Sequence, residues 1–525
     1  MKRNLSILLV VMMVLGLALG CAQTATGSEQ TTESTGSETA VSVEGEAAEP
    51  ANDVLNLTLN TVGNSMDPHN SGLLIDLQVE YQMYEGLLNC DEDAKISGRL
   101  AESYTVSEDG TTYSFKLRQD VFFHNGEKMT ADDVVWSYNR AMGCAQMATY
   151  VAAIDHVEKI DEDTVNIVLK YPYAPFVYYC SMIKILSQKA VEEAGDLYGT
   201  IACPAGTGPY MMEEYDPNTK IVLKAFDNYY RGVPQIKTIN YYVITDASIA
   251  LIAFENGDLD LASIPTANWT EIEESGLYTT DVIASTSTIY LALNVGQDGP
   301  LGNKLVRQAI QYAIDKESLI LIALDGMGVS AEHMNTVGRF DGAVETDWNY
   351  EYNPEKAKEL LTQAGYPDGV YIGSIESAKY KVVAEALQAQ LAQVGITCDL
   401  EIGETSTLVV DWRAGNYDMI CNIYPVVFTY DFYRKYNDYT IETVFMKYDH
   451  NTETDEVYIK EMFDEAAAEL DDSKRAALYK ELEEYLMDAA AWVPLYNAEL
   501  PYAWNSDLNA YAYVQYYEVF DWSWK

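Results

Sequence analysis

The chain has 525 residues, which is more than one hydrophobic core usually serves, so we expect two or three domains. Apolar residues make up 48% of it and charged residues 22%, a composition that excludes a wholly disordered chain. The net charge of -48 excludes nucleic acid and anionic lipid headgroups as partners, because like charges repel. This charge either keeps an exported protein soluble and monomeric or draws in cationic ligands, and both interpretations stay open.

The N-terminus has the features of a secretory signal. Lys2 and Arg3 precede an uncharged apolar run over 5–19, which is short for a membrane span of about 20 residues. Small residues and Cys21 follow, and they resemble the end of a bacterial lipobox, although Ala18 stands where leucine is common. We therefore expect residues 1–21 to be the signal and Cys21 to be lipidated. The alternative is an ordinary signal peptide with an incidental cysteine.

A polar stretch separates this signal from the first predicted strand. Residues 22–52 consist mostly of Thr, Ser, Gly, Glu and Ala and contain no aromatic residue. Such a segment buries too little apolar surface to fold, so we expect a flexible tether that fixes the protein to the bacterial membrane from outside. Two acyl chains on Cys21 would hold it stably. Among the other six cysteines, Cys398 and Cys421 lie in strand-like runs and form the first candidate disulfide.

Strands and helices are predicted along the rest of the chain by periodicity and capping residues. Alternation predicts strands, whereas an apolar residue every three to four positions predicts helices. Thr130 with Asp133 is typical of a capping box, and Asn353 with Pro354 is typical of a helix start. The expected strands are 54–59, 112–117, 221–223, 239–244 and 396–402, and the expected helices begin at 131, 354, about 383 and about 472. Helices alternate with strands between 300 and 430, which favours a mixed α/β lobe with a largely parallel sheet.

Several kinds of catalytic chemistry lack their motif. The five histidines are scattered without an H-x-x-x-H pair, which argues against a zinc site, and no G-x-x-x-x-G-K-[ST] loop for ATP is present. Gly206-Thr207-Gly208 is followed by Pro209 and is interpreted as a turn. Ser181 and Lys184 match the S-x-x-K spacing of penicillin-recognising serine enzymes, but the companion K-T-G is absent. A secreted serine hydrolase acting on cell-wall peptides is kept as the alternative of another class.

A series of short blocks then resembles one family in the order in which they occur. The most specific block is 117–134, which joins a strand end, the Asn125-Gly126 turn and the capped helix. The other blocks are Met66–His69, Tyr84–Leu88, Leu100–Tyr104, Gly206–Tyr210, Asn228–Gly232, Val306–Lys316 and Asn353–Tyr366. Together they resemble the peptide/nickel class (family 5) of ABC-transporter extracytoplasmic solute-binding proteins, which includes dipeptide- and oligopeptide-binding proteins.

This resemblance implies an architecture. It implies an α/β, two-lobed periplasmic-binding-protein-like fold with an extra subdomain and mixed sheets joined by a hinge. The implied boundaries are 53–87 for the first part of lobe I, 88–204 for the extra subdomain, 205–299 for the second part of lobe I, 300–490 for lobe II and 491–525 for the return to lobe I.

The resemblance also implies a function. The chain would capture di- or oligopeptides by closure of the lobes and pass them to separate permease and ATPase subunits, as a monomer that is not an enzyme and needs no cofactor. An oligosaccharide or another solute without an amine is the alternative within the importer role. A peptide-signal receptor without transport also remains open, whereas the scattered histidines give nickel binding no support.

Family members hold the peptide with a few groups, and the resemblance places most of their counterparts here. Ser71 and Gly72 fall where backbone and hydroxyl groups face the ligand. Lys379 falls in the loop that carries the arginine for the peptide carboxylate, where it would act as a point charge or simply as a solvated lysine. Trp412 is also expected to line the site.

The counterpart of the amine-binding aspartate is missing. Val427 stands where the aspartate would be, and Tyr424 stands where the preceding aromatic residue would be. A buried ammonium facing a valine would lack its charge partner, which is costly. Either Asp431 takes over with a shifted loop, or the ligand has no amine there and Tyr424, Phe428 and Tyr430 form an apolar or sugar-stacking wall. Core packing is the alternative role of these aromatic residues.

Overall fold

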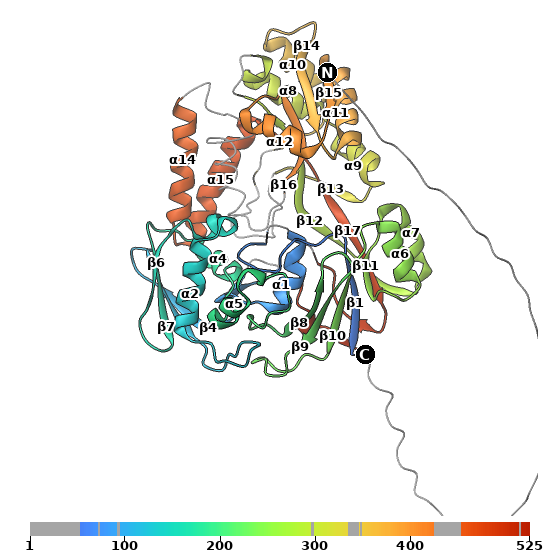
Figure 1. The fold of residues 1–525 in the computed structure, drawn as a ribbon. Helices are drawn as coiled ribbons and strands as arrows, with labels where there is room; N and C mark the ends of the chain where they lie inside the picture. Colours follow the sequence, from blue (N-terminus) through green and yellow to red (C-terminus); the bar gives the residue numbers. More distant parts are fainter. Residues whose placement is uncertain are drawn as a thin grey trace, which may run out of the picture. The chain divides into compact units, whose positions relative to one another are not determined.

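The computed structural model describes residues 53–71, 74–91, 95–295, 299–333, 346, 349–424, 453–513 and 516–525 (Figure 1). The first sheet has the strand order β1-β10-β9-β8, with β1 parallel to β10 and the other neighbours antiparallel. Leu55, Leu57 and Leu59 of β1 are buried and alternate with half-buried residues, as the pattern predicts. The strands of this sheet are β1 (Val54–Leu59), β8 (Tyr210–Asp216), β9 (Lys220–Ala225) and β10 (Thr238–Val243). The helices of the same parts of the chain are α1 (Leu77–Met83), α6 (Ala247–Glu255) and α7 (Trp269–Ser275).

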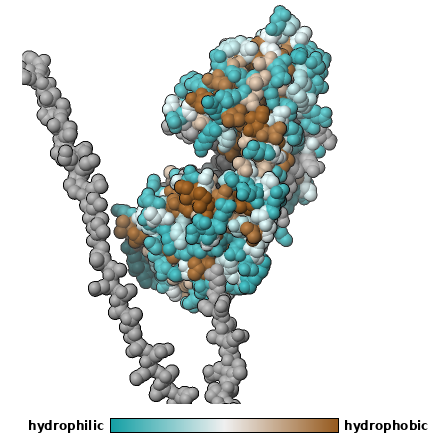
Figure 2. All heavy atoms as spheres, turned by 90° about the vertical axis from the view of Figure 1, so that its right-hand side faces the viewer, coloured by the Kyte–Doolittle hydropathy of each residue, from teal (hydrophilic) through white to brown (hydrophobic). Residues whose placement is uncertain are grey.

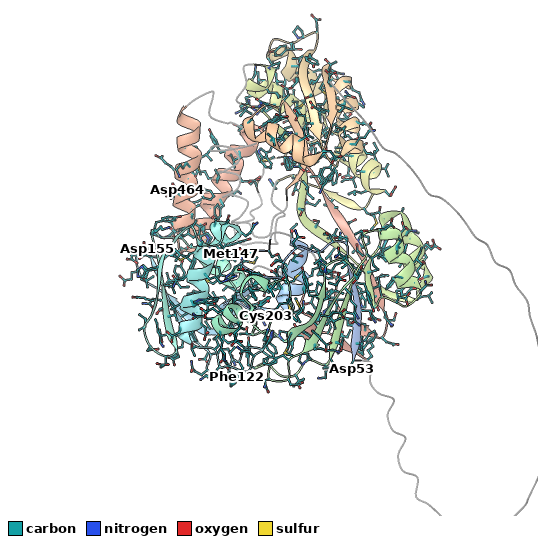
Figure 3. All side chains as sticks on the ribbon, in the orientation of Figure 1. Asp53, Phe122, Met147, Asp155, Cys203 and Asp464 are labelled. Carbon is teal, nitrogen blue, oxygen red and sulfur yellow. The ribbon has the colours of Figure 1, made fainter. Side chains whose placement is uncertain are left out.

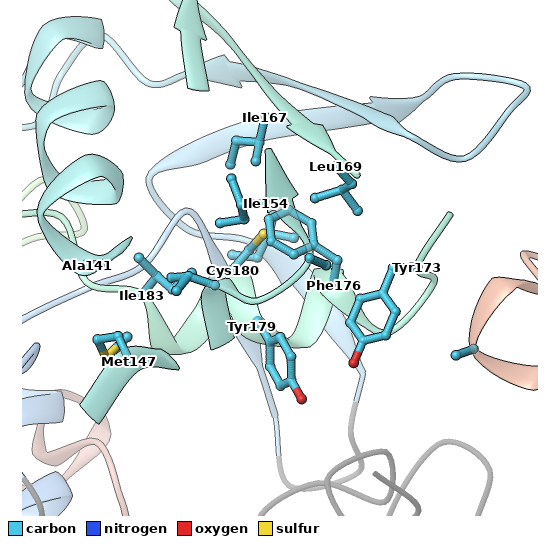
Figure 4. Close-up of a cluster of buried hydrophobic side chains, with 14 of the residues drawn as sticks. Ala141, Met147, Ile154, Ile167, Leu169, Tyr173, Phe176, Tyr179, Cys180 and Ile183 are labelled. Atoms are coloured by element: carbon cyan, nitrogen blue, oxygen red, sulfur yellow. The ribbon is translucent and has the colours of Figure 1, made fainter. Parts of the chain in front are cut away.

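A second sheet, with the order β4-β5-β7-β6, is antiparallel throughout. The predicted capping box is confirmed, because Thr130 and Asp133 exchange side-chain and backbone hydrogen bonds at the start of α2. Figure 4 shows the apolar cluster of this region, in which Phe176 and the Cys180 thiol lie among aliphatic side chains. The elements here are β2 (Leu88–Cys90), β3 (Ile96–Gly98), β4 (Ala101–Val106), β5 (Thr112–Leu117), α2 (Ala131–Met142), α3 (Ala148–Val151), β6 (Ile154–Lys159), β7 (Thr164–Leu169), α4 (Phe176–Met182) and α5 (Gln188–Ala194).

The third sheet contains the two longest described strands, β12 (Tyr278–Leu293) and β17 (Trp492–Asn505), which pair antiparallel. Its order is β11-β17-β12-β16-β14-β15, with β13 on β17. β14 is parallel to both β15 and β16, whereas the pairings of β11, β12, β13 and β16 with their other neighbours are antiparallel. The sheet is therefore mixed, and the largely parallel sheet expected between 300 and 430 is found only around β14. Its other strands are β11 (Leu261–Ser263), β13 (Gly328–Ser330), β14 (Val370–Ser377), β15 (Ile396–Ile402) and β16 (Met419–Tyr424). Strands β18 (Leu508–Asn509) and β19 (Ser523–Trp524) form a separate two-stranded sheet.

The helices that cover β14 and β15 bury a separate apolar cluster. Asn353 caps α10 by accepting from the Lys356 amide, and Pro354 is its first residue, as predicted. Gly365 follows that helix with a φ of 95°, a conformation that favours glycine. The helices from Lys304 onward are α8 (Lys304–Ala313), α9 (Lys316–Leu324), α10 (Pro354–Gln363), α11 (Lys381–Gln393), α12 (Thr405–Ala414), α14 (Glu453–Ala468) and α15 (Asp472–Ala489).

Helices α14 and α15 pack against each other and share an apolar cluster with the β4-β5-β7-β6 region. The Ala174 amide donates to the carbonyl of Ala467 on α14 over 2.8 Å. These two helices therefore contact the predicted extra subdomain, although they belong to the segment 300–490 assigned to lobe II. The predicted domain boundaries themselves stay predictions.

The predicted Cys398–Cys421 disulfide is wrong. Cys398 lies on β15 and Cys421 on β16, and β14 runs between these two strands. Two strand spacings amount to about 9.6 Å, whereas a disulfide needs Cα atoms within about 6.8 Å. The six cysteines in the described part of the chain are all free thiols.

The surface is mainly hydrophilic, as Figure 2 shows for one face. Exposed carboxylates are spread over it, among them Asp155 on β6 and Asp464 on α14, which Figure 3 labels. Within the described ranges, no helix combines the length and the apolar composition that crossing a membrane would require.

Candidate solute-binding site

Ser71, the first predicted ligand residue, ends a tight polar turn. Its amide donates to the Asp67 carbonyl over 2.7 Å, and its Oγ donates to Asp76 Oδ2 over 2.9 Å. Asp76 is buried and also accepts from the Gly63 amide over 2.8 Å. The hydroxyl of Ser71 is therefore held by the protein in this conformation, and the turn is fixed on both sides.

An ion pair supports the same turn from the α2 side. Arg140 Nη1 and Nη2 donate to Asp67 Oδ1 and Oδ2 over 3.0 and 2.6 Å, a bidentate arrangement. His69 Nε2 donates to the Lys184 carbonyl over 2.9 Å. Burial and the nearby Arg140 lower the pKa of His69 to about 4, so this imidazole is neutral at physiological pH. The Met66–His69 block is thus a structural support for the turn that ends at Ser71.

Two buried charged residues, Glu80 and Lys184, lie beside this turn. Burial and the neighbouring Asp76 raise the pKa of Glu80 to about 8. Burial lowers the pKa of Lys184 to about 8, and Glu80 opposes that change. The Lys184 ammonium lies 3.7 Å from the centre of the Tyr81 ring, a cation–π contact.

The geometry of Ser181 and Lys184 does not match a serine hydrolase. Ser181 Oγ donates to the carbonyl of Tyr178 over 2.7 Å, and Lys184 Nζ donates to the Ser181 carbonyl over 2.8 Å. The ammonium therefore bonds the backbone of Ser181 and not its hydroxyl, and both side chains are buried. A general base must reach the proton that it removes, so this pair is not arranged for nucleophilic catalysis.

On the other side of the long strands, the end of β14 carries a buried carboxylate. Glu376 accepts from Trp412 Nε1 over 2.7 Å, and burial raises the pKa of Glu376 to about 7. Trp412 is only 1% exposed and belongs to an apolar cluster. Lys379 lies in the turn after β14, where it is exposed and forms no hydrogen bond or ion pair with another described residue. Lys379 is thus available to a solute, whereas Trp412 is packed inside.

Most of the remaining predicted residues lie outside the part of the chain that the structure describes. Gly72, Val427, Phe428, Tyr430 and Asp431 are outside the described residues. Tyr424 is the last residue of β16, where its backbone pairs with Thr288 of β12. The structure therefore places Ser71, Lys379 and Trp412 in separate elements and joins none of them by a contact.

The pairing of β12 with β17 is interrupted where β16 joins the sheet. The register shifts between Ala284 and Thr288, which is typical of a β-bulge. Asn497 Nδ2 fills the interruption by donating to Thr288 Oγ1 over 2.9 Å and to the Ser287 carbonyl over 3.0 Å. Buried polar side chains at this bulge mark a local bend between the two ends of the long strands.

The sequence prediction missed a cavity of about 730 Å³, a size typical of small-molecule sites. It lies among the β2-β3 hairpin, the end of β5, the loop after β9, β12 and the C-terminal return. Its lining includes Arg99, Arg118, Tyr230, Arg231, Tyr516 and Glu518. None of the described residues predicted from the sequence as ligand contacts lines this cavity.

A buried charge network shares Arg99, Tyr230, Arg231 and Glu518 with the lining of this cavity. Glu85 accepts from the hydroxyls of Tyr229, Tyr230 and Thr207 over 2.9 to 3.0 Å, and Arg99 Nη1 lies 3.6 Å away. Burial raises the pKa of Glu85, and Arg99 opposes this change.

Glu518 extends the network to the C-terminal return. Arg99 bonds Glu518 directly, and Arg231 Nη1 donates to Glu518 Oε2 over 3.0 Å. Burial opposes the effect, but the two arginines hold the pKa of Glu518 below its usual range. Arg99 and Arg231, which both line the cavity, are therefore paired with a carboxylate of the protein.

A signal for this cluster was present in the sequence. Glu85 lies in the block 84–88, Thr207 in 206–210, and Tyr229 with Tyr230 in 228–232. These blocks carry the family resemblance, but their spacing along the chain does not show that they meet around one carboxylate.

The comparisons with known proteins agree with this fold. The sequence model of bacterial extracellular solute-binding proteins, family 5 (Middle), matches residues 95–434. The glutathione-binding protein GsiB of Salmonella paratyphi A is 31% identical over 351 residues, which cover 63% of this chain and 66% of that protein. GsiB of Escherichia coli K12 is 31% identical over 347 residues, with the same coverage. The match thus spans slightly less than two thirds of these relatives.

Solved structures support the same architecture. NikA from Brucella suis, in complex with Fe(III)-EDTA, has a TM-score of 0.80 at 24% identity and covers 90% of this chain and 100% of its own. DppA from Helicobacter pylori, in complex with the peptide STSA, has a TM-score of 0.72 at 23% identity and covers 90% of this chain and 98% of its own. The expected α/β, two-lobed periplasmic-binding-protein fold is therefore confirmed. On the family match over more than half of its length, the chain belongs to family 5 of the bacterial extracellular solute-binding proteins.

Proposed function

We propose that this protein captures a peptide of two or a few residues outside the cytoplasm and delivers it to the permease and ATPase subunits of an ABC importer. The observation that carries this proposal is the family match over residues 95–434. Relatives 31% identical to the chain are glutathione-binding proteins, and glutathione is itself a small peptide. No catalytic role is proposed, because Ser181 and Lys184 are buried and bonded to backbone carbonyls.

The proposed binding surface has two parts on different lobes. Ser71 supplies a rigid turn on the side of β1, and Lys379 supplies an exposed ammonium after β14. A solute carboxylate would meet Lys379 at low cost, because no carboxylate among the described residues pairs with it. Tyr424, Val427, Phe428, Tyr430, Asp431 and Gly72 remain proposed contacts from the family resemblance, whereas the buried position of Trp412 favours a supporting role for that residue.

Thermal-shift and calorimetric titration of the purified mature protein test this proposal. The panel contains glutathione, dipeptides, tripeptides, a trisaccharide and Ni²⁺. We expect micromolar binding of at least one peptide and a raised unfolding temperature, since a ligand that binds only the folded state stabilises it. Binding of the trisaccharide with no response to any peptide would refute the peptide assignment and favour the oligosaccharide alternative.

The variant Lys379→Ala tests the proposed carboxylate contact. We expect peptide affinity to fall by about tenfold, in the range of a lost charge-assisted hydrogen bond. Lys381→Ala is the matched control, because Lys381 is also exposed and lies two residues further along. Equal affinities of the two variants would show that residue 379 does not contact the solute.

We also propose that Cys21 carries the lipid that anchors the protein. The support is the apolar run before Cys21 and the polar stretch 22–52 after it. Mass spectrometry of the N-terminal peptide should find a diacylated cysteine at position 21. Cys21→Ala should release the protein from membranes, and continued membrane association of that variant would contradict the anchor.

A further inference from the structure

The 730 Å³ cavity holds cationic side chains that are already neutralised. Arg99 bonds Glu518 and Asn89, and Arg118 makes two hydrogen bonds to Asp120 over 2.8 and 3.0 Å. Arg231 contacts Glu518 over 3.0 Å and Asp521 over 3.7 Å. An anionic solute would therefore have to displace a carboxylate of the protein to reach any of these arginines.

The carboxylates around the cavity outnumber the arginines. Those that line it are Asp91, Asp281, Glu518 and Asp521, against Arg99, Arg118 and Arg231. Asp281 on β12 is exposed and accepts a hydrogen bond from the amide of Val282 over 2.9 Å. No lysine or arginine in the described part of the chain forms an ion pair with Asp281. The cavity thus has an excess of negative charge.

Aromatic rings add a second feature that favours cations. Tyr230 lines the cavity with the Arg118 guanidinium 4.6 Å from its ring centre. Tyr516 also lines it and stacks on Tyr81 with the ring centres 4.0 Å apart, while Lys184 lies 3.7 Å from the Tyr81 centre. Tyrosine faces attract ammonium and guanidinium groups, as Tyr230 already does with Arg118. Tyr81, which Lys184 contacts, stacks on Tyr516 but does not itself line the cavity.

We propose that this cavity is a binding site for an organic cation with primary ammonium groups, separate from the proposed peptide contacts at Ser71 and Lys379. Asp281 receives one ammonium group, Asp521 receives the other in place of its 3.7 Å contact with Arg231, which keeps Glu518 at 3.0 Å, and the tyrosine rings contact the aliphatic chain. The volume is ample for a linear diamine. All residues of this site line one cavity, so cation binding there does not require that the importer's solute be bound.

Calorimetric titration of the mature protein with cadaverine tests this proposal, and glutarate, an anion of the same chain length, is the control ligand. We expect saturable cadaverine binding that weakens as salt is raised, and no binding of glutarate. The double variant Asp281→Asn/Asp521→Asn should weaken cadaverine binding by about tenfold. Circular dichroism should show that this variant is folded, since the Asp521 side chain is 53% exposed and Asp281 is also exposed.

A charge-matched control separates the cavity from the general acidity of the protein. The double variant Asp258→Asn/Asp368→Asn removes the same charge at two exposed positions that do not line the cavity. We expect it to change cadaverine affinity by less than about twofold. Equal weakening by both double variants, or equal binding of glutarate, would overturn the proposal. Peptide titrations are run separately, so the peptide function and the cation site fail or stand independently.

Discussion

Replacing Arg99 by methionine should destabilise the protein because Arg99 lies between the buried carboxylate of Glu85 and the half-buried carboxylate of Glu518. Its side chain is 10% exposed, and those of Glu85 and Glu518 are 4% and 21% exposed. Removing one partner of a buried ion pair costs about 3–5 kcal/mol. Glu518 keeps Arg231 at 3.0 Å, and Glu85 keeps three hydroxyl donors. We therefore expect a loss near the lower limit, about 3 kcal/mol at pH 8.

The loss should depend on pH with a defined sign. Burial raises the pKa of Glu85, and Arg99 is the strongest influence that opposes this. Without Arg99 the folded-state pKa rises further above the unfolded value, so the folded variant takes up a proton as the pH falls. A neutral Glu85 carboxyl needs no cation, so the variant loses this stability only as the pH rises from the unfolded-state pKa of Glu85 through its raised folded-state pKa. The destabilisation should therefore be smaller at pH 5.5 than at pH 8.

Urea unfolding followed by tryptophan fluorescence at the two pH values measures this effect. The control is Arg118→Met, because the Arg118–Asp120 pair is 31% and 57% exposed and should contribute less than about 1 kcal/mol. The reasoning is refuted if Arg99→Met is no more destabilising than Arg118→Met, or if its effect is the same at pH 5.5 and pH 8.

Three further outcomes are expected. Burial raises the pKa of Glu80 to about 8 in the folded state. The wild-type protein should therefore lose stability between pH 5.5 and pH 8 relative to Glu80→Gln, by up to about 1.4 kcal/mol per pH unit. If the urea midpoints of the two proteins change with pH by the same amount, this prediction is wrong. Trp412→Phe should reduce the free energy of unfolding by about 1–2 kcal/mol, because the bond from its Nε1 to Glu376 is lost. The peptide affinity of this variant should be unchanged. A large loss of affinity without destabilisation would show instead that Trp412 contacts the solute. Thiol titration in denaturant should find Cys90, Cys144, Cys180, Cys203, Cys398 and Cys421 all reactive without reductant, and a smaller number would show a disulfide.

Local patterns predicted the elements of the fold well. The strand over 54–59, the capping box at Thr130 and the helix start at Asn353 depend on neighbouring residues, so the sequence carries them directly. The Cys398–Cys421 pair failed because strand order is a long-range property. Both cysteines lie in strands of one sheet, but β14 enters between them.

The role of Trp412 could not be read from its own segment. A tryptophan on a helix is compatible with a ligand wall or with a core, and its neighbours in sequence do not decide between them. In the structure the indole N–H of Trp412 donates a hydrogen bond to Glu376, which lies 36 residues earlier in the chain. The same limit applies to Ser71, whose hydroxyl is held by Asp76.

The blocks that carried the family resemblance explain why the sequence indicated the family more clearly than the solute. Glu85, Thr207 and the pair Tyr229 and Tyr230 come from three of these blocks and meet in hydrogen bonds on one carboxylate. Arg99, beside a fourth block, balances that carboxylate. A buried charge tolerates few substitutions, since each one leaves an unpaired group.

Residues that contact a solute face no such demand when the solute is absent, and they can differ between proteins with the same interior. Lys379 illustrates this, because it is exposed and no described neighbour depends on it. The family blocks therefore consist largely of residues that hold the interior of the lobes together. Exposed groups such as Lys379 are free of those supports, so they can vary without cost to the interior, and the Lys379→Ala titration tests the proposed solute contact directly.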